Sequence, residues 1–141
     1  MIEPALIVMG FDFGTKKIGV AVGQGLTRSA TPIGIISARD GIPVWADIEA
    51  LIKHWQPRLL VVGLPLNMDD SMGPIALRAE KFARRLTGRF NLPHQTIDER
   101  LSSYEARLRS DHRGNIDAIA AQLILETYFR SLPPTNFTPK Q

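Results

Sequence analysis

The chain has 141 residues, of which 44% are hydrophobic and 22% are charged, and this length and composition are typical of a single globular domain. The net charge of +3 only weakly indicates a polyanionic partner. It contains no cysteine, so disulfides, cysteine nucleophiles and thiolate metal sites are excluded, and oxygen or histidine must hold any metal. No window is as long and apolar as a membrane span and no signal-peptide pattern is found, so we expect a cytoplasmic protein without a membrane partner.

Apolar residues in the first part of the chain predict three strands. The first two span residues 5–13 and 18–22, and the turn Gly14-Thr15-Lys16-Lys17 joins them. A connection this short makes the pair an antiparallel hairpin. The segment "PIGIIS", residues 32–37, predicts the third strand, and Asp40-Gly41 then interrupts the chain.

Helix and strand patterns alternate in the rest of the chain. Apolar residues recur at helical spacing from Val44 to Trp55, and we expect Pro57 to end that helix. The continuous apolar run "RLLVVGLP" predicts a buried central strand. A long helix begins near Pro74, followed by the strand "HQTID", the short helix "SSYEARLR" and the final helix "NIDAIAAQLILETYF". The expected core faces of the two long helices are Ile75, Ala79, Phe82, Ala83 and Leu86 in the first, and Ile116, Ile119, Ala120, Leu123 and Ile124 in the second.

The predicted order is three strands in a meander, then helix, strand, helix, strand, helix. A doubly wound nucleotide-binding fold does not begin with a tight antiparallel hairpin, whereas the ribonuclease H architecture does. We therefore predict an α/β fold with a ribonuclease H-like mixed five-stranded sheet flanked by helices. It forms a single nuclease domain over residues 1–141, and we expect the tail from about residue 133 to be frayed.

Asp12 lies between two phenylalanines in the apolar run "LIVMGFDFG". A carboxylate loses solvation in such a strand, so its presence there indicates a functional role. In the predicted fold it can meet acids from distant parts of the chain. Asp98 and Glu99 end the fifth strand, and the sequence leaves open which of them takes part and which pairs with Arg100. Asp117 lies in the first turn of the last helix, where it could also serve only to stabilise the helix N-terminus. Three such carboxylates suit Mg²⁺, which prefers oxygen ligands and supports phosphodiester cleavage.

Four stretches follow one another across most of the chain: "FDFGTKKIGVAVGQ", "VVGLPLNMDDSMGP", "DERLSSYEAR" and "NIDAIAAQLILETYF". In this order they resemble the YqgF family, also called RuvX. This ribonuclease H-like group is described as Holliday junction resolvases and as nucleases that mature the precursor of 16S ribosomal RNA.

The resemblance implies an endonuclease that uses Mg²⁺ or Mn²⁺ and acts on precursor rRNA or branched DNA. Ribosomal particles are further candidate partners, and the sequence leaves open whether the protein is a monomer or a homodimer. By the same resemblance, the catalytic and metal-binding acids are Asp12, Glu99 and Asp117, with Asp98 as an additional candidate metal ligand. The segment "LRSDHRGN" is shorter than in many relatives, and in it Arg113 stands where the family usually has a lysine.

Basic and polar residues complete the predicted nucleic-acid site. Those on the long helix recur every three or four residues, which fits a phosphate track or a solvated helix face equally well. Lysines in the hairpin turn follow the predicted catalytic strand directly. The candidate nucleic-acid-binding residues are Lys16, Lys17, Asn67, Arg78, Lys81, Arg85, Arg100 and Arg113.

Two other functions remain open from the sequence. The string Asp12-Phe13-Gly14-Thr15 also matches the first phosphate loop of actin- and Hsp70-type nucleotide-binding domains, although the chain is short for their two lobes. The other alternative is a non-catalytic ribosome-assembly module that binds RNA and keeps a vestigial site. A nuclease needs all three acids and a divalent metal, whereas a binding module tolerates their loss.

Overall fold

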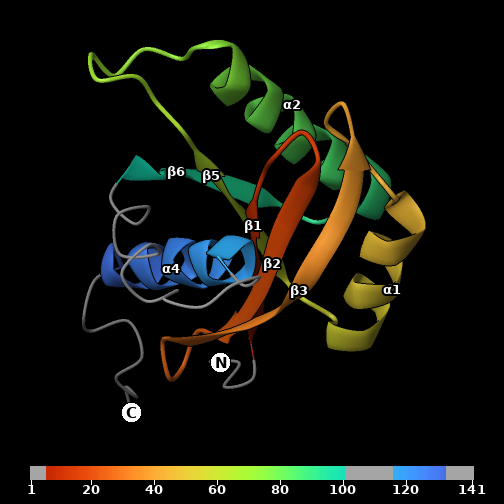
Figure 1. Cartoon of the computed structure of the whole chain (residues 1–141). Coiled ribbons are helices and arrows are strands. Elements are labelled where there is room, and N and C mark those ends of the chain that lie inside the picture. Colours follow the sequence, from red (N-terminus) through yellow and green to blue (C-terminus); the bar gives the residue numbers. More distant parts are fainter. Residues whose placement is uncertain (1–5, 101–115, 133–141) are drawn as a thin grey trace.

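The computed structural model describes residues 6–100 and 116–132, and its strands form one mixed sheet with the order β4-β3-β2-β1-β5-β6 (Figure 1). Within the described residues there are six strands and three helices. The strands are β1 Ile7–Asp12, β2 Lys17–Gln24, β3 Ser29–Arg39, β4 Ile42–Pro43, β5 Leu59–Leu64 and β6 His94–Asp98, and the helices are α1 Trp45–Trp55, α2 Pro74–Phe90 and α4 Ile116–Arg130.

The predicted hairpin and meander are confirmed. β1 pairs antiparallel with β2, and β2 pairs antiparallel with β3. β5 lies between β1 and β6 and runs parallel to both, as expected for a strand buried on both faces. The ribonuclease H-like α/β class is therefore correct, and the carboxyl ends of β1, β5 and β6 meet at one edge of the sheet.

The prediction of five strands is wrong by one short strand. β4 has two residues and pairs antiparallel with the end of β3, where Arg39 lies opposite Ile42. Asp40 and Gly41 connect them, with φ angles of 51° and 82°. Positive φ at both central residues is typical of a two-residue hairpin turn, which Asp-Gly favours. The Asp-Gly pair therefore forms the turn of a hairpin. A strand of only two residues has no apolar pattern from which it could be predicted.

The sheet separates two layers of helices. Figure 1 shows α4 on one face, with α1 and α2 on the other. Successive strand residues point to opposite faces. In β1, Met9 and Phe11 therefore belong to the core beneath α1 and α2, whereas Val8 belongs to the core beneath α4.

The helices follow their predicted bounds with small differences. Pro74 is the first residue of α2, as predicted, but Ile75 is 43% exposed, so its expected burial is wrong. The buried face starts one position later, at Ala76. α1 ends at Trp55 because Gln56 adopts a left-handed conformation and its N–H donates to the Ile52 carbonyl.

α4 is buried on more than the single face predicted for it. Leu123 and Ile124 are fully buried, as expected, but so are Ala121 and Leu125 on another side of the helix. A helix buried on several sides lacks a narrow apolar stripe. The predictions for the side chain of Ile116, the helix "SSYEARLR" and the tail fall outside the described part of the chain. No helix in the described part is both long and apolar enough to cross a membrane.

Candidate active site

Asp12 is the last residue of β1 and lies on the face of the sheet that α4 covers. Its neighbours Phe11 and Phe13 pack on the opposite face, beneath α1 and α2. Asp12 lies opposite Gly19 of β2. A Cβ atom at Gly19 would lie 1.9 Å from the backbone oxygen of Asp117. Glycine at this position therefore allows the first turn of α4 to rest on β2 beside Asp12.

Glu99 reaches the same face from the other side of β5. Its backbone N–H donates to the Leu64 carbonyl at 3.0 Å, which extends the β5–β6 pairing by one residue. Ile97, two residues earlier, packs in the core beneath α4, and the two-residue period of a strand carries Glu99 to the same side. The Oε1 atom of Glu99 is buried, and it lies 2.9 Å from where a Cβ atom at Gly63 would be.

The structure therefore brings together the three predicted catalytic acids, Asp12, Glu99 and Asp117, which we call the acid cluster. Burial, then the charge of Glu99, a hydrogen bond with Glu99 and the charge of Asp117 together raise the pKa of Asp12 from 3.8 to about 9. Burial and the charge of Asp98 also raise the pKa of Glu99, against the effect of its hydrogen bond with Asp12. Two carboxyl groups hydrogen-bond to each other only when one holds a proton, so the pair shares a proton near neutral pH.

The acid cluster fits a hard divalent cation by the chemistry of its donors. It offers only carboxylate oxygens, which Mg²⁺ and Mn²⁺ prefer. The raised pKa values of Asp12 and Glu99 show that negative charge is costly at this place, and a bound cation would lower that cost. In residues 6–100 and 116–132, no three acidic or histidine side chains are already arranged to hold a metal ion. The Asp12–Glu99 hydrogen bond accordingly has to open before both carboxylates can ligate.

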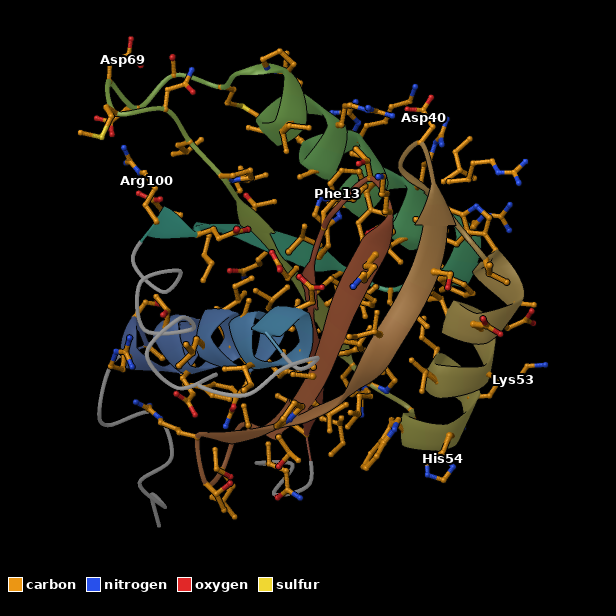
Figure 2. All side chains as sticks on the ribbon, viewed as in Figure 1. Phe13, Asp40, Lys53, His54, Asp69 and Arg100 are labelled. Atoms are coloured by element: carbon orange, nitrogen blue, oxygen red, sulfur yellow. The ribbon has the colours of Figure 1, made fainter. Side chains whose placement is uncertain are left out.

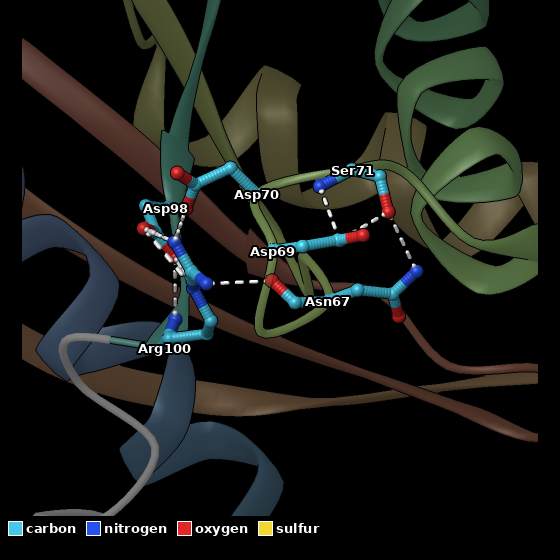
Figure 3. A network of polar contacts seen from close by, with 6 residues as sticks. All are labelled: Asn67, Asp69, Asp70, Ser71, Asp98 and Arg100. Atoms are coloured by element: carbon cyan, nitrogen blue, oxygen red, sulfur yellow. Dashed lines mark hydrogen bonds and ion pairs between the residues drawn. The ribbon is translucent and has the colours of Figure 1, made fainter.

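Asp98 lies outside the acid cluster, on the opposite side of the strand end. Its carboxylate accepts hydrogen bonds from Arg100 Nε at 2.9 Å and from Arg100 Nη2 at 2.7 Å (Figure 3). The side-chain hydrogen bonds from Arg100 hold the pKa of Asp98 below its usual value. The structure thus gives the two neighbouring acids different surroundings: Asp98 pairs with Arg100 and Glu99 joins Asp12.

Arg100 also ties the loop after β5 to the end of β6. Its Nη1 donates to the Asn67 carbonyl at 2.6 Å, and its Nη2 donates to Asp70 Oδ1 at 2.7 Å. Within the loop, Asp69 Oδ1 accepts from the Ser71 backbone N–H at 3.0 Å. We call this set the loop network: Asn67, Asp69, Asp70, Ser71, Asp98 and Arg100 (Figure 3).

The predicted nucleic-acid contacts Asn67 and Arg100 are both part of the loop network. The Asn67 side-chain amide donates to Ser71 Oγ at 3.0 Å, and Arg100 makes the bonds described above. Figure 2 shows Arg100 at the end of β6, near the loop that carries Asp69. The polar groups of both residues already form hydrogen bonds within the protein. A contact with a phosphate would therefore have to be made in addition to these bonds or replace them.

The other predicted basic residues lie in two places. Lys16 is exposed in the turn between β1 and β2, and Lys17 is exposed at the first residue of β2, close behind the strand that carries Asp12. Arg78, Lys81 and Arg85 instead line a hollow beside α2, on the α1–α2 side of the sheet. The structure does not describe Arg113.

Two residues that position the acid cluster were not predicted from the sequence. Gly19 and Gly63 lie on the α4 face of the sheet and leave the space that Asp117 and Glu99 occupy. Their role depends on which strand residues face α4. The alternation of side chains along "FDFG" and "KIGVAVG" indicates which residues share a face of the sheet. Which of the two faces meets α4 follows only from the pairing of β1, β2 and β5.

Comparison with known proteins gives one family. A family model described as "RuvX: Holliday junction resolvase" matches residues 6–131. A protein of Shewanella denitrificans named "Putative pre-16S rRNA nuclease" is 52% identical over 132 residues, which cover 88% of this chain and 94% of the relative. A protein of the same name from Saccharophagus degradans is 48% identical over 136 residues, 91% of this chain and 96% of the relative.

Solved structures with low sequence identity share the fold. RuvC of Thermus thermophilus in complex with a Holliday junction substrate matches with a TM-score of 0.58 at 13% identity, covering 88% of this chain and 93% of RuvC. The fowlpox virus Holliday junction resolvase matches with a TM-score of 0.57 at 11% identity, covering 89% and 99%. At these identities the likeness shows a common ribonuclease H-like architecture.

Proposed function

The chain belongs to the RuvX family and is a nuclease of nucleic acids, and we propose that it is a divalent-metal-dependent endonuclease that processes the precursor of 16S rRNA. The observation that supports the proposal is the acid cluster, in which Asp12 and Glu99 share a hydrogen bond on the face of the sheet where the first turn of α4 rests on β2, close enough for the charge of Asp117 to raise the pKa of Asp12. Function is argued here from this site, since the ribonuclease H-like fold alone hosts several activities.

In this proposal Asp12, Glu99 and Asp117 hold Mg²⁺ or Mn²⁺. When bound, the metal activates water and stabilises the leaving oxygen of the phosphodiester. The protein's part is to keep the three carboxylates close together in a largely buried place. Because Asp12 and Glu99 share a proton without metal, ion binding must release that proton. Asp98 is left out of the metal site because Arg100 already neutralises it.

Precursor 16S rRNA is favoured over a DNA junction by the relatives that share about half of their residues with this chain. The junction is supported by the family description and by structures whose likeness is one of fold. Cytoplasmic location, ribosomal particles as partners and a monomeric or homodimeric state are further parts of the proposal.

The test is a cleavage assay on two labelled substrates, a precursor 16S rRNA fragment and a four-way DNA junction. Each is incubated with Mg²⁺, Mn²⁺, Ca²⁺ or EDTA, and Asp12→Asn is the matched control. We expect RNA cleavage with Mg²⁺ and Mn²⁺, and little with Ca²⁺, whose looser and longer coordination positions water poorly. Cleavage that survives EDTA or Asp12→Asn would overturn the proposal.

Two added measurements, RNA binding and thermal stability with Mg²⁺-ATP, distinguish the two other functions. A ribosome-assembly module would bind the RNA without cleaving it, and Asp12→Asn would bind equally well. A nucleotide-binding domain would gain thermal stability from Mg²⁺-ATP through linkage and would cleave neither substrate. Either pattern contradicts the nuclease.

A further inference from the structure

A basic groove runs along α2 on the side of the sheet opposite the acid cluster. Its first part is a hollow of about 210 Å³ lined by Phe13, Trp45, Arg78, Lys81, Phe82 and Arg85, together with residues of the β3–β4 turn and β4. A second hollow, of about 460 Å³, is lined by Trp45, Arg85, Gly88 and Arg89. Both hollows are lined by Trp45 and Arg85, so they lie next to each other along α2, and together we call them the basic groove. Each is far larger than the roughly 10–15 Å³ that one water needs.

The groove carries a marked excess of positive charge. Among the residues that the structure describes, Asp40 is the only acid that lines either hollow, and its carboxylate is 3.1 Å from Arg78 Nη2. Within residues 6–100 and 116–132, Lys81 and Arg85 form no ion pair. Two cations therefore face the groove without a compensating carboxylate from the described part of the chain.

Arg84 shows that the excess charge is specific to the groove side of α2. It lies next to Arg85 in the sequence but lines neither hollow. Its Nη1 is 3.3 Å from Glu80 Oε1, one turn earlier on the helix. The same helix thus carries a neutralised cation on one side and uncompensated cations on the other.

Aromatic rings form the base of the groove. Trp45 stacks on Phe82 with a centroid distance of 6.0 Å and an angle of 22° between the rings. The guanidinium carbon of Arg89 lies 4.3 Å from the centre of a Trp45 ring. Arg89 is exposed, so a planar group can replace its guanidinium on the indole. Cations beside an aromatic ring are what proteins use to hold an unpaired nucleic-acid strand.

The groove and the acid cluster lie on opposite faces of the sheet but share neighbouring residues of one segment. Phe13, which lines it, directly follows Asp12 and points to the other face. The Gly41 N–H donates to the Thr15 carbonyl at 2.9 Å, so the β3–β4 turn that lines the groove is fixed to the turn that carries Lys16 and leads to Lys17. Figure 2 shows Asp40 at the tip of that wall and Phe13 between the sheet and α2.

We propose that this basic groove binds an unpaired strand of the substrate, away from the bond that is cut. Lys81 and Arg85 contact its phosphates, and a base stacks on Trp45 in place of Arg89. An unpaired strand fits better than a duplex, because bases inside a duplex do not offer a free face to an aromatic side chain. The inference rests on the proposed nuclease function and adds the class of substrate that the enzyme prefers, one with a single-stranded flank.

The binding test uses Asp12→Asn protein, so that bound RNA stays intact. Affinity for a single-stranded RNA of roughly 12 nucleotides and for a duplex of the same length is measured by fluorescence anisotropy at several salt concentrations. The double variant Lys81→Ala/Arg85→Ala is compared with Arg84→Ala. We expect the double variant to lose roughly tenfold or more in single-strand affinity and about 0.7 from the salt slope per lost phosphate contact. Arg84→Ala should resemble its parent.

A second readout follows the ring itself. The chain has two tryptophans, so Trp55→Phe leaves Trp45 as the only one. Single-stranded RNA should quench its emission, and the double variant should abolish the quenching. Unchanged single-strand affinity in the double variant, an equal loss on the duplex, or no quenching would each overturn the groove proposal.

Failure of the groove and failure of the nuclease remain distinguishable. With Asp12 restored, the double variant should still cleave at saturating RNA, with a raised KM and little change in kcat. A wild-type protein that cleaves nothing contradicts the proposed function, whatever the groove binds. A wild-type protein that cleaves, with a double variant whose KM is unchanged, contradicts the groove alone.

Discussion

Asp98 and Glu99 follow one another in the chain but lie in two regions with opposite electrostatics. Asp98 belongs to the loop network, where Arg100 pairs with it and holds its pKa low. Glu99 belongs to the acid cluster, where burial and neighbouring carboxylates raise the pKa values of both Glu99 and Asp12. The strand period separates them, since consecutive residues point to opposite faces.

The difference shows how one strand end can place two adjacent acids in opposite electrostatic surroundings. A carboxylate that already has an arginine gains little from a metal ion. A buried carboxylate surrounded by other carboxylates keeps a proton until a cation replaces it. Compensation by the protein, rather than position in the sequence, therefore distinguishes the two roles.

Gly19→Ala should have the largest effect, because it pushes α4 away from the sheet beside the acid cluster. The new Cβ atom would lie 1.9 Å from the Asp117 backbone oxygen, so α4 must move away from β2. Overpacking typically costs about 1–3 kcal/mol of unfolding free energy, and a clash with backbone should lie at the upper end, about 3 kcal/mol. Chemical denaturation measures the loss, and cleavage should fall with it because Asp117 moves with α4.

Gly88→Ala is the matched control for this substitution. Gly88 lies inside α2, and a Cβ atom there meets nothing within 4 Å. Alanine in a helix interior should therefore stabilise the protein by roughly 0.5–1 kcal/mol. A Gly19→Ala protein as stable and active as wild type would show that α4 is not held against the acid cluster in the way described.

Asp12→Asn should change how stability depends on pH in the metal-free protein. The pKa of Asp12 is about 9 in the folded chain against 3.8 for the ordinary group, so the folded state keeps a proton that the unfolded state has lost. The stability from this group is complete below about pH 4 and is lost as pH rises through about 9. In EDTA, the unfolding free energy of wild type should therefore fall relative to that of Asp12→Asn as pH rises from about 4 to about 9, by on the order of 2–4 kcal/mol.

Added Mg²⁺ provides the control for the pH experiment. It should restore the stability of wild type at high pH by linkage and should leave Asp12→Asn unchanged. Identical pH profiles for the two proteins in EDTA would mean that Asp12 is not held in a protonated, charge-crowded site.

Arg100→Ala should have a smaller effect, and it should act first on the loop network. It removes the bonds to Asp98, Asp70 and the Asn67 carbonyl, so the loop after β5 should become more sensitive to limited proteolysis. Cleavage activity should fall several-fold, since Glu99 directly precedes Arg100. Arg100→Lys keeps the charge but lacks the planar fork, and it should rescue the activity only in part. Unaltered proteolysis in Arg100→Ala would contradict this role.

The sequence predicted more of the fold than of the site's geometry. The hairpin, the buried strand "RLLVVGLP" and the start of α2 at Pro74 are local patterns, and all three are confirmed. The choice between Asp98 and Glu99 could not be made locally, because it depends on which face of β6 meets α4. β4 was missed since two residues carry no period, and Ile75 was misplaced by one position on its helix.

Side-by-side cleavage by Glu99→Gln and Asp98→Asn tests the central claim most directly. Both variants replace one carboxylate by its amide, at adjacent positions, and both are measured under single-turnover conditions with Mg²⁺ on the precursor 16S rRNA fragment. We expect Glu99→Gln to lose at least about a hundredfold in rate, because loss of an outer ligand partner alone costs about 10- to 100-fold. Asp98→Asn should stay within about tenfold of wild type. The reverse order, with Asp98→Asn inactive and Glu99→Gln active, would contradict the assignment of Glu99 to the acid cluster and of Asp98 to the loop network.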